Sequence, residues 1–269
     1  VHYGVNTKTQ QLDYEQIEKL AHEVRPKLII AGYSAYSRTI NFEAFGNIAR
    51  QVGAYLMCDT AHITGLIIGK VHPSPFPYAD VVTTTTHKTL RGPRGAMIIC
   101  REELREKIFP KVFPGLQGGP HNHTIAAMGV ALQEAMTPAF RKYASQIVRN
   151  AKALAMNLQI YGFEIISGGT DNHVMLVDLR SKEIRGKQAQ ELLESAGIVA
   201  NRNTIPFDPS SPFNPSGVRF GTPAVTTRGM KEREMKKIAR WIAEVISDLE
   251  SAPFIKKEIK AFCKNFPIP

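Results

Sequence analysis

A lysine, a histidine and a run of threonines lie together in the stretch Ala79–Gly95, whose sequence is ADVVTTTTHKTLRGPRG. The apolar pair Val81–Val82 is typical of a buried strand, and the β-branched threonines that follow suit an extended backbone. Lys88 comes directly after His87, where the strand gives way to a turn rich in glycine and proline. A lysine amine at such a strand end can attack an aldehyde, as in enzymes that hold pyridoxal phosphate on a lysine. The alternative is a solvated lysine on a turn.

A second group of polar side chains follows the short apolar run Tyr55–Asp59, which we expect to be a strand. A pyridoxal ring acts as an electron sink when a carboxylate keeps its nitrogen protonated, and Asp59 has the right type and place. The alternative for Asp59 is a cap of the next helix. His62 would share a face with Asp59 if this segment were helical, and could then reach the ring hydroxyl. The pair could also be half of a metal site, but we find no further ligands and expect no metal.

Other residues have types that suit a polar substrate. Ser34 follows the apolar run Leu28–Gly32, another expected strand. Arg219 lies in a short apolar stretch bounded by glycines. Since burying a guanidinium alone is costly, we expect either a substrate carboxylate or an internal acid to pair with it. The loop-like segments Asn201–Asn203 and Ser211–Phe213 could hydrogen-bond a heterocycle, although each is a weak signal alone.

Strands and helices alternate along the chain, and this alternation would position the reactive residues. Strands are expected over residues 28–32, 55–59, 81–85, 95–100, 163–166, 174–178 and 218–220. Helices are expected over residues 14–24, 42–52, 102–109, 120–136, 138–160, 186–196, 229–249 and 254–262, with a loop over 113–120. The pattern predicts the α/β class. Polar residues at three successive strand ends should meet, because ligands of open α/β sheets bind at the carboxyl ends of strands.

Composition sets limits on the class of protein. The chain has 269 residues, 43% hydrophobic and 22% charged, as in ordinary globular proteins with one large or two ordinary domains. No apolar run is long enough for a membrane span, so we expect no membrane partner. The net charge of +10 is spread along the chain, which suits small anions and requires no nucleic acid. Three cysteines without a CxxC pair indicate neither disulfides nor zinc, and favour a reducing, cytoplasmic location.

Six motifs together make the chain resemble one family, serine hydroxymethyltransferase, a fold-type I pyridoxal-phosphate transferase. They are SAYS at residues 34–37, DTAH at 59–62, VVTTTTHKTLRGPRG at 81–95, FPGLQGGPHNH at 113–123, SGGTDNH at 167–173 and GVRFGTPA at 217–224. The threonine run ending in His-Lys is highly specific, and the resemblance extends over nearly the whole chain. It implies a pyridoxal 5'-phosphate cofactor, with tetrahydrofolate as co-substrate.

The resemblance also implies roles for single residues. Lys88 would carry the cofactor as a Schiff base, and Asp59 would pair with the pyridine nitrogen. Gly118 and Gly119 would reach the cofactor phosphate of a partner subunit, which implies an obligate homodimer that could assemble into a tetramer. The implied catalytic residues are Lys88, Asp59, His62, His87 and Thr85; the implied cofactor contacts are Lys88, Asp59, His62, Ser34, Ala61, Gly118 and Gly119; the implied substrate or folate contacts are Arg219, Ser34, Arg94, Asn203, Ser211, Pro212 and Phe213.

The family implies the interconversion of serine and glycine with transfer of a one-carbon unit to tetrahydrofolate. We expect residues 1–137 to be the later part of a cofactor-binding large domain with a mixed, mostly parallel sheet, and residues 138–269 to be a small α+β domain. The family's upstream part, with most of the phosphate-binding cup, is absent, so we expect the chain alone to be poorly active. The lack of a eukaryotic insertion before Phe113 indicates a bacterial-type member. The alternatives are a threonine-aldolase-type pyridoxal enzyme, a non-catalytic fragment and a basic RNA-binding module.

Overall fold

The computed structural model describes residues 1–269, which form two compact units. The first consists of Val1–Gly4, Asp13–Ser34 and Thr39–Ala144, and the second of Val5–Leu12, Ala35–Arg38 and Ser145–Pro269. The units therefore divide after Ala144, whereas the sequence predicts a domain boundary at residues 137/138, which stays a prediction. Each unit is described by itself below.

The first unit contains a four-stranded sheet in the order β1-β2-β3-β4. Its strands are β1 (Leu28–Ala31), β2 (Tyr55–Asp59), β3 (Val81–Thr85) and β4 (Ala96–Cys100). The first three are parallel, and β4 runs antiparallel to β3. The prediction of a mixed, mostly parallel sheet is therefore confirmed.

Most helices of the first unit begin and end where local sequence signals predict. The elements are α1 (Tyr14–Val24), α2 (Phe42–Val52), α3 (Thr64–Ile68), η1 (Glu102–Leu104), α4 (Arg105–Pro110), η2 (Lys111–Leu116) and α5 (Asn122–Ala135). Asn41 caps α2, because its side-chain oxygen accepts a hydrogen bond from the amide of Ala44 at 3.0 Å. The short α3 was not predicted, and η2 is a helical turn, interrupted by extended backbone at Phe113, where we predicted a loop.

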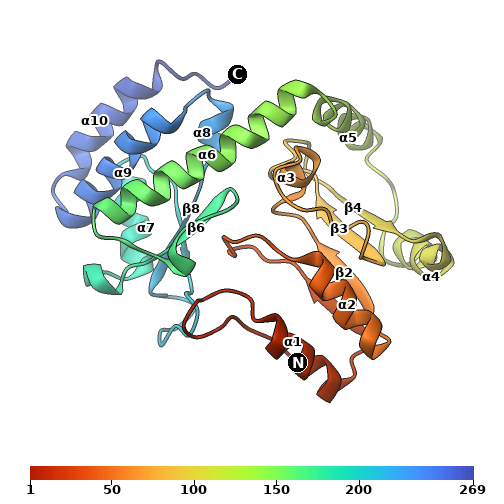
Figure 1. Cartoon of the computed structure of the whole chain (residues 1–269). Helices are drawn as coiled ribbons and strands as arrows, with labels where there is room; N and C mark the ends of the chain where they lie inside the picture. Colours follow the sequence, from red (N-terminus) through yellow and green to blue (C-terminus); the bar gives the residue numbers. More distant parts are fainter. The chain divides into compact units, whose positions relative to one another are not determined.

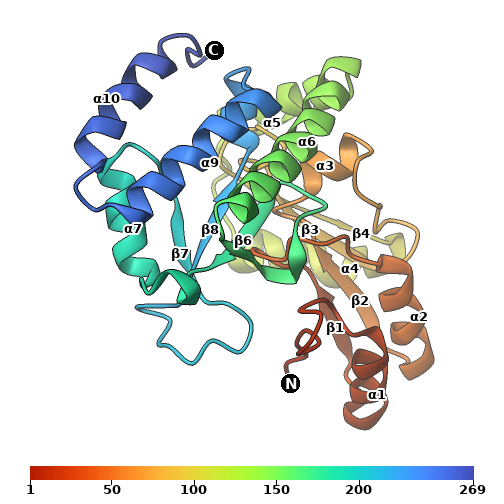
Figure 2. The same cartoon turned by 60° about the vertical axis from the view of Figure 1, so that its left-hand side comes forward.

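Only one face of this sheet is covered by helices of the unit. The helix α2 packs against β1 and β2, and α1 packs against α2, on the same side of the sheet (Figure 2). On the opposite face Leu28, Ile30 and Tyr55 are 43%, 49% and 47% exposed. Sheets with parallel strands are usually covered on both faces. The uncovered face is therefore an apolar surface, and it leads to the candidate site at the carboxyl ends of the strands.

The second unit is built on an antiparallel sheet with the order β5-β6-β8-β7. The strands are β5 (Glu164–Ile165), β6 (Val174–Asp178), β7 (Asn201–Asn203) and β8 (Gly217–Gly221). The helical elements are α6 (Pro138–Ile160), which begins in the first unit, and η3 (Ile166–Gly168), η4 (Arg180–Lys182), α7 (Gly186–Ser195), α8 (Pro223–Thr227), α9 (Glu232–Ser247) and α10 (Ala252–Cys263). Figure 1 shows α7, α9 and α10 beside this sheet. This is an α+β arrangement, as predicted for the second half of the chain.

One prediction for this unit is wrong. Asn201–Asn203 is the edge strand β7, paired with β8, and not a loop. Three polar residues in a row carry no alternation of apolar side chains, so the sequence alone gave no signal for a strand.

A single large apolar cluster fills the core of the second unit. Trp241 is 2% exposed, and Leu158, Leu193 and Met235 are fully buried beside it in the same cluster. The helix α9 supplies many of these side chains, because its apolar residues recur on one face. None of the helices combines the length and the apolar character that a membrane span requires.

Candidate functional site

The carboxyl ends of β1, β2 and β3 lie at one edge of the first sheet, because the three strands are parallel. Ser34 follows β1, Asp59 ends β2, and His87 and Lys88 follow β3. The expectation that three successive strand ends bring polar side chains to one edge therefore agrees with the strand order. Such an edge is where ligands bind in open α/β sheets.

Asp59 presents a carboxylate to the outside of this edge. Its Oδ1 accepts a hydrogen bond from the amide of Ala61 at 3.0 Å, and the side chain is exposed. The other oxygen, Oδ2, makes no hydrogen bond or ion pair within the chain and can accept one from a ligand. Gly32, directly after β1, lies against the backbone of Asp59. Only glycine fits there, because a Cβ would lie 2.2 Å from the Asp59 carbonyl oxygen.

The segment after Asp59 is a turn, and this corrects the assumption that Asp59 and His62 share a helical face. The helix α3 begins only at Thr64. The amide of Thr60 instead continues the sheet by donating to the Thr83 carbonyl at 2.8 Å. The carboxylate of Asp59 then bonds its own backbone two residues on, as in an Asx turn. Asp59 therefore lies at the end of a strand, and His62 lies in the turn that follows it.

The threonine run divides into two functional pairs, because successive side chains of a strand point to opposite faces. Thr83 stands opposite Asp59 in the parallel register, so Thr83 and Thr85 lie on the open face. Thr84 and Thr86 are buried instead, and the Thr86 hydroxyl donates to the Pro93 carbonyl at 2.6 Å. Thr83 and Thr85 are therefore available to a ligand, whereas the hydroxyls of Thr84 and Thr86 bond within the fold.

The loop that carries Lys88 is held by one backbone hydrogen bond that joins its ends and another within it. The amide of Thr86 donates to the Gly95 carbonyl at 3.0 Å, and the amide of Arg91 donates to the Lys88 carbonyl at 3.0 Å. The Lys88 side chain is half-buried, and its amine makes no hydrogen bond or ion pair within the chain. A lysine on a held backbone, whose amine has no internal partner, is suited to covalent attachment of an aldehyde.

Thr89 ties this loop to the turn after β2. Its hydroxyl donates to the His62 carbonyl at 2.9 Å and accepts from the amide of Gly65 at 3.0 Å. A Cβ on Gly65 would lie 2.1 Å from the Thr89 carbonyl oxygen, so the two backbones touch. Thr85 adds a longer contact of 3.5 Å from its hydroxyl to the Ala61 carbonyl. Sequence reasoning missed Thr89 and Gly65, although both lie within or beside the recognised motifs.

His87 and Arg94 form a small basic group beside Lys88. The His87 Nδ1 accepts from the amide of Gly95 at 3.4 Å, and its Nε2 lies 3.5 Å from a guanidinium nitrogen of Arg94. Arg94 itself is exposed. The guanidinium of Arg94 suits an anionic ligand.

Gly118 and Gly119 lie in an exposed segment between η2 and α5. A Cβ at either position would meet no atom within 4 Å. No neighbour within this chain therefore requires glycine there, and their predicted contact with a partner subunit stays a prediction.

The remaining predicted substrate residues lie in the second unit. Arg219 is on the central strand β8, opposite Asn201 in the register, so Arg219 and Asn203 share one face of the small sheet. Burial lowers the pKa of the Arg219 guanidinium, as expected for a charge partly removed from water. The loop residues Ser211, Pro212 and Phe213 are exposed, and Phe213 is 83% exposed.

Asp208 shapes the loop that carries these exposed residues. Its carboxylate accepts hydrogen bonds from the amide of Ser216 at 2.9 Å, the Ser216 hydroxyl at 2.7 Å and the amide of Ser210 at 2.9 Å. Burial alone would raise the pKa of Asp208, but these bonds and one from the amide of Ile205 lower it to about 2. The loop is therefore organised around an ionised carboxylate, which sequence reasoning did not identify.

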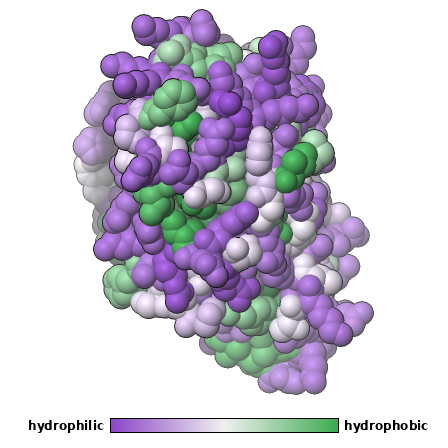
Figure 3. Space-filling model, turned by 90° about the vertical axis from the view of Figure 1, so that its left-hand side faces the viewer, coloured by the Kyte–Doolittle hydropathy of each residue, from purple (hydrophilic) through white to green (hydrophobic).

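One groove of the second unit is lined by none of the predicted site residues. It measures about 700 Å³ and lies over α9 and α10, where Lys237 stands 5.0 Å above the centre of the Trp241 ring. The side of the molecule shown in Figure 3 is mostly hydrophilic, with separate hydrophobic patches. Arg240 and Trp241 both donate to Glu258 there, at 2.8 Å and 2.7 Å. The charged side chains Lys237, Arg240 and Glu258 thus have partners within the chain, and we assign no ligand to this groove.

The residues at the sheet edge fit a pyridoxal-type cofactor. Such a cofactor needs an amine for its aldehyde and a carboxylate for its ring nitrogen. Lys88 offers an amine without an internal partner, and Asp59 offers one carboxylate oxygen, at neighbouring strand ends. No group of three or more His, Cys, Asp or Glu side chains is arranged to hold a metal ion.

One comparison with known proteins bears on this site. The family model described as serine hydroxymethyltransferase matches residues 1–242. The match includes both units' candidate residues, from Ser34 to Arg219, and ends within α9.

Proposed function

This chain belongs to the serine hydroxymethyltransferase family, and from that premise we propose that it is a glycine hydroxymethyltransferase. Its reaction would interconvert serine and glycine and transfer a one-carbon unit to tetrahydrofolate. The family implies a pyridoxal-phosphate-dependent transferase of fold type I, and the α/β structure with its mostly parallel sheet is consistent with that. The observation that carries the proposal is the Lys88 amine, held without an internal partner at the strand edge that also presents Asp59.

Lys88 and Asp59 would hold the cofactor from two sides. The Lys88 amine would attach to its aldehyde carbon, and the free Oδ2 of Asp59 would keep a proton on the ring nitrogen. When bound, the cofactor supplies a ring that draws electrons away from the substrate α-carbon. The hydrogen bond from Ala61 fixes Asp59 in place, so the carboxylate needs little reorganisation to serve the ring.

The neighbouring polar groups would orient the reactants and move protons. Thr85 and Ser34 present hydroxyls, and His62 an imidazole, within the same edge of the sheet. Arg94 would contribute positive charge, and His87 a polar ring, near an anionic part of the cofactor or substrate. Ala61 would pack on a face of the ring, since it lies in the turn directly after Asp59.

The remaining roles rest on the family alone. Arg219 would bind the substrate carboxylate, and Asn203 with Ser211, Pro212 and Phe213 would border the folate. Gly118 and Gly119 would contact the cofactor phosphate of a partner subunit in a homodimer or tetramer. We also propose a cytoplasmic location, and the division into a large-domain part, residues 1–137, and a small domain, residues 138–269.

The first test is chemical and needs no turnover. Borohydride reduction of the protein with pyridoxal phosphate should link the cofactor to one peptide, the one that contains Lys88, as seen by mass spectrometry. Attachment elsewhere, or none, would contradict the proposed role of Lys88.

The second test separates the proposal from a threonine-aldolase-type enzyme. Cleavage of serine should depend on added tetrahydrofolate if the chain is part of a hydroxymethyltransferase. Serine cleavage that is independent of folate, with faster cleavage of threonine, would favour the aldolase.

A further inference from the structure

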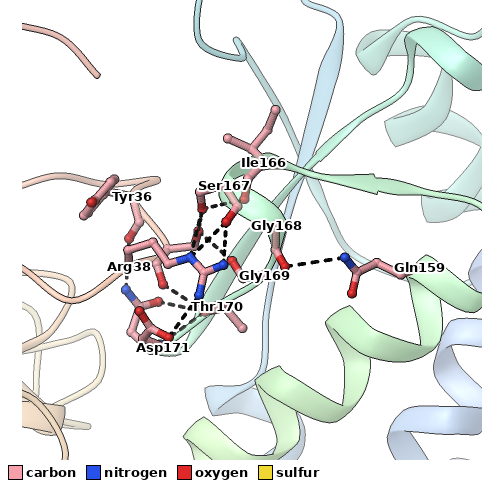
Figure 4. Close-up of polar contacts among 11 residues, drawn as sticks. Tyr36, Arg38, Gln159, Ile166, Ser167, Gly168, Gly169, Thr170 and Asp171 are labelled. Atoms are coloured by element: carbon pink, nitrogen blue, oxygen red, sulfur yellow. Dashed lines mark hydrogen bonds and ion pairs between the residues drawn. The ribbon is translucent and has the colours of Figure 1, made fainter. Parts of the chain in front are cut away.

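A group of polar contacts holds loops together in each of the two units. In the second unit, the guanidinium of Arg38 holds the segment Ala35–Arg38 to residues 167–171 (Figure 4). Its Nε donates to the Ser167 carbonyl at 3.1 Å, and a terminal nitrogen forms an ion pair with Asp171 at 3.1 Å. The group in the first unit is centred on Thr89, the residue directly after Lys88, and it therefore bears on the candidate site.

Thr89 bonds to the turn after β2 at two points. The residue is buried, with 2% of its surface exposed. Its hydroxyl donates to the His62 carbonyl at 2.9 Å and accepts from the amide of Gly65 at 3.0 Å. Because a hydroxyl donates and accepts at the same time, this one side chain connects the loop of Lys88 to the segment that follows Asp59.

The helix α3 depends on Thr89 for one of its first amides. The first amides of an α-helix have no partner within the helix. Ile63, which precedes α3, offers no side-chain cap, and the amide of Thr64 bonds to the Thr60 carbonyl at 2.8 Å. Thr89 supplies the partner of the next amide, that of the buried Gly65. Loss of the Thr89 hydroxyl would leave a buried amide unpaired, which is costly.

The backbones of Gly65 and Thr89 are in direct contact. A Cβ built on Gly65 would lie 2.1 Å from the Thr89 carbonyl oxygen and 3.0 Å from the amide nitrogen of Leu90. Only glycine allows two backbones to approach this closely. The loop of Lys88 and the start of α3 are therefore connected by two hydrogen bonds and by a contact that leaves no room for movement toward each other.

The other restraints on the loop lead to a different part of the first unit. Leu90 is buried in an apolar cluster with residues of α5 and α6. The guanidinium of Arg91 lies 4.6 Å from the centre of the Tyr143 ring on α6. The Thr85 hydroxyl also reaches the turn after β2, but at the longer distance of 3.5 Å. Thr89 therefore makes the shorter connection between this loop and the turn.

We propose that Thr89 is a positioning residue of the candidate site: its hydroxyl and its contact with Gly65 set the place of the Lys88 backbone relative to the turn after Asp59. The amine and the carboxylate belong to segments that follow different strands, so their separation depends on a connection between these segments. The proposal rests on the proposed function in that Lys88 and Asp59 serve the same cofactor.

The test disrupts the connection in two ways in the full-length protein. Thr89→Val keeps the shape of the side chain and removes the hydroxyl, whereas Gly65→Ala keeps the hydroxyl and forces the backbones apart. Thr89→Ser keeps both hydrogen bonds and is the conservative variant. Thr64→Val is the matched control, because it removes another buried threonine hydroxyl, one that bonds to Thr60 and Thr84 and not to the Lys88 loop.

Two readouts separate positioning from stability. Amide hydrogen exchange of residues 86–92 measures how firmly the loop is held and needs no cofactor. The rate at which added pyridoxal phosphate attaches to Lys88, followed by absorbance and by borohydride trapping of the Lys88 peptide, measures the effect on the site.

Thr89→Val and Gly65→Ala should both speed exchange of residues 86–92 and slow attachment by roughly tenfold or more, since small displacements of a reacting group are costly. Thr89→Ser should resemble the wild type in both readouts. Thr64→Val should leave both unchanged despite a loss of stability. If Thr89→Val does not fold, Thr89→Ala leaves room for a water molecule to pair the two backbone groups, and it should still slow attachment.

The outcomes separate the two proposals. Unchanged exchange in the folded variant without the Thr89 hydroxyl would overturn the connection, and faster exchange with an unchanged attachment rate would overturn its role at the site. Equal slowing by Thr64→Val would assign the effect to lost stability and would also overturn it. A wild-type protein that attaches no pyridoxal phosphate to Lys88 would overturn the proposed function instead, while exchange still decides whether Thr89 holds the loop.

Discussion

Lys88 and Asp59 owe their proposed roles to what their neighbours do with hydrogen bonds. The backbone around Lys88 is closed by Arg91 and Thr86, yet its amine has no partner within the chain. Asp59 uses one oxygen for the amide of Ala61 and keeps the other available. In both residues the backbone is held by hydrogen bonds, while the Lys88 amine and the Asp59 Oδ2 are available to a ligand. A site for a covalently bound cofactor requires this combination.

We predict that Lys88→Gln removes cofactor attachment and lowers turnover by at least about 10³-fold, because no other residue at the edge offers an amine. The visible absorption band of the attached cofactor and the rate of serine cleavage measure this. Lys107→Gln, which changes an exposed lysine of α4, should leave both unchanged. Comparable turnover in the two variants would remove Lys88 from the mechanism.

Gly32→Ala should destabilise the first unit and displace Asp59. The added Cβ would meet the Asp59 carbonyl oxygen and Cβ at 2.2 Å and 2.8 Å, and the φ of 156° disfavours a side chain. We expect a loss of about 1–3 kcal/mol in the free energy of unfolding, measured by urea titration, together with weaker cofactor binding. Gly53→Ala separates the two causes, because Gly53 has a φ of 70° but no atom within 4 Å of its Cβ position. Equal effects of both variants on cofactor binding would contradict the steric argument.

At the scale of elements, the alternation of side chains along β3 gives the threonines of one run two different roles. Thr83 and Thr85 face the side that carries Asp59, while Thr84 and Thr86 bond to other parts of the fold. In the loop of residues 204–216, a single carboxylate holds the backbone at several points. Asp208 accepts hydrogen bonds from amides that precede it and follow it in the chain.

The Asp208 loop should lose stability in acid. The pKa of Asp208 is about 2 in the folded chain, below its ordinary value of 3.8. The ionised group therefore stabilises the fold above pH 3.8, and this contribution is lost as the pH falls toward 2. We expect about 1–2 kcal/mol from this source after solvent screening, measured by urea unfolding between pH 2 and pH 7.

Asp208→Asn should flatten that pH dependence and lower stability at pH 7. Ser216→Ala removes only one of the donors and should produce a smaller part of the same change. An unchanged acid profile in Asp208→Asn would show that other groups cause the acid sensitivity.

At the scale of the whole molecule, the two compact units have separate cores and different degrees of closure. The second unit encloses one large apolar cluster around Trp241. The first leaves one face of its sheet exposed, with Leu28, Ile30 and Tyr55 among the uncovered side chains. An uncovered apolar face contributes little to folding free energy, so the first unit should be the less stable of the two.

Trp241 is the only tryptophan of the chain, so its fluorescence reports on the second unit. Leu193→Ala, in the core around Trp241, should lower the stability seen by Trp241 fluorescence by about 2–5 kcal/mol. Exchange protection of the β1–β3 amides should be unaffected. Leu56→Ala, which changes a buried residue of the first unit, should lower the exchange protection of the β1–β3 amides and leave the stability seen by Trp241 fluorescence unchanged. If either variant lowers both, the two units unfold as one cooperative unit.

Much of the fold could be predicted because local signals agree with the tertiary structure. The strands Tyr55–Asp59 and Val81–Thr85 and the helices Tyr14–Val24 and Phe42–Val52 have the predicted bounds. Apolar runs closed by turn residues and amphipathic helices with caps are recognisable without neighbours. The edge strand Asn201–Asn203 could not be recognised, because only its pairing with β8 makes it a strand.

The sequence by itself determined which residues could do chemistry and that three strand ends carry them, since residue type and apolar periodicity are local properties. Only the tertiary structure decided how they are used: which threonines face outward, that His62 lies in a turn, and that Arg38 holds the segment after Ser34. These depend on hydrogen bonds between residues far apart in the chain, such as Arg38 with Ser167 and Asp171. Such contacts leave no periodic trace in the sequence, because a guanidinium and a carbonyl meet only after the backbone has folded.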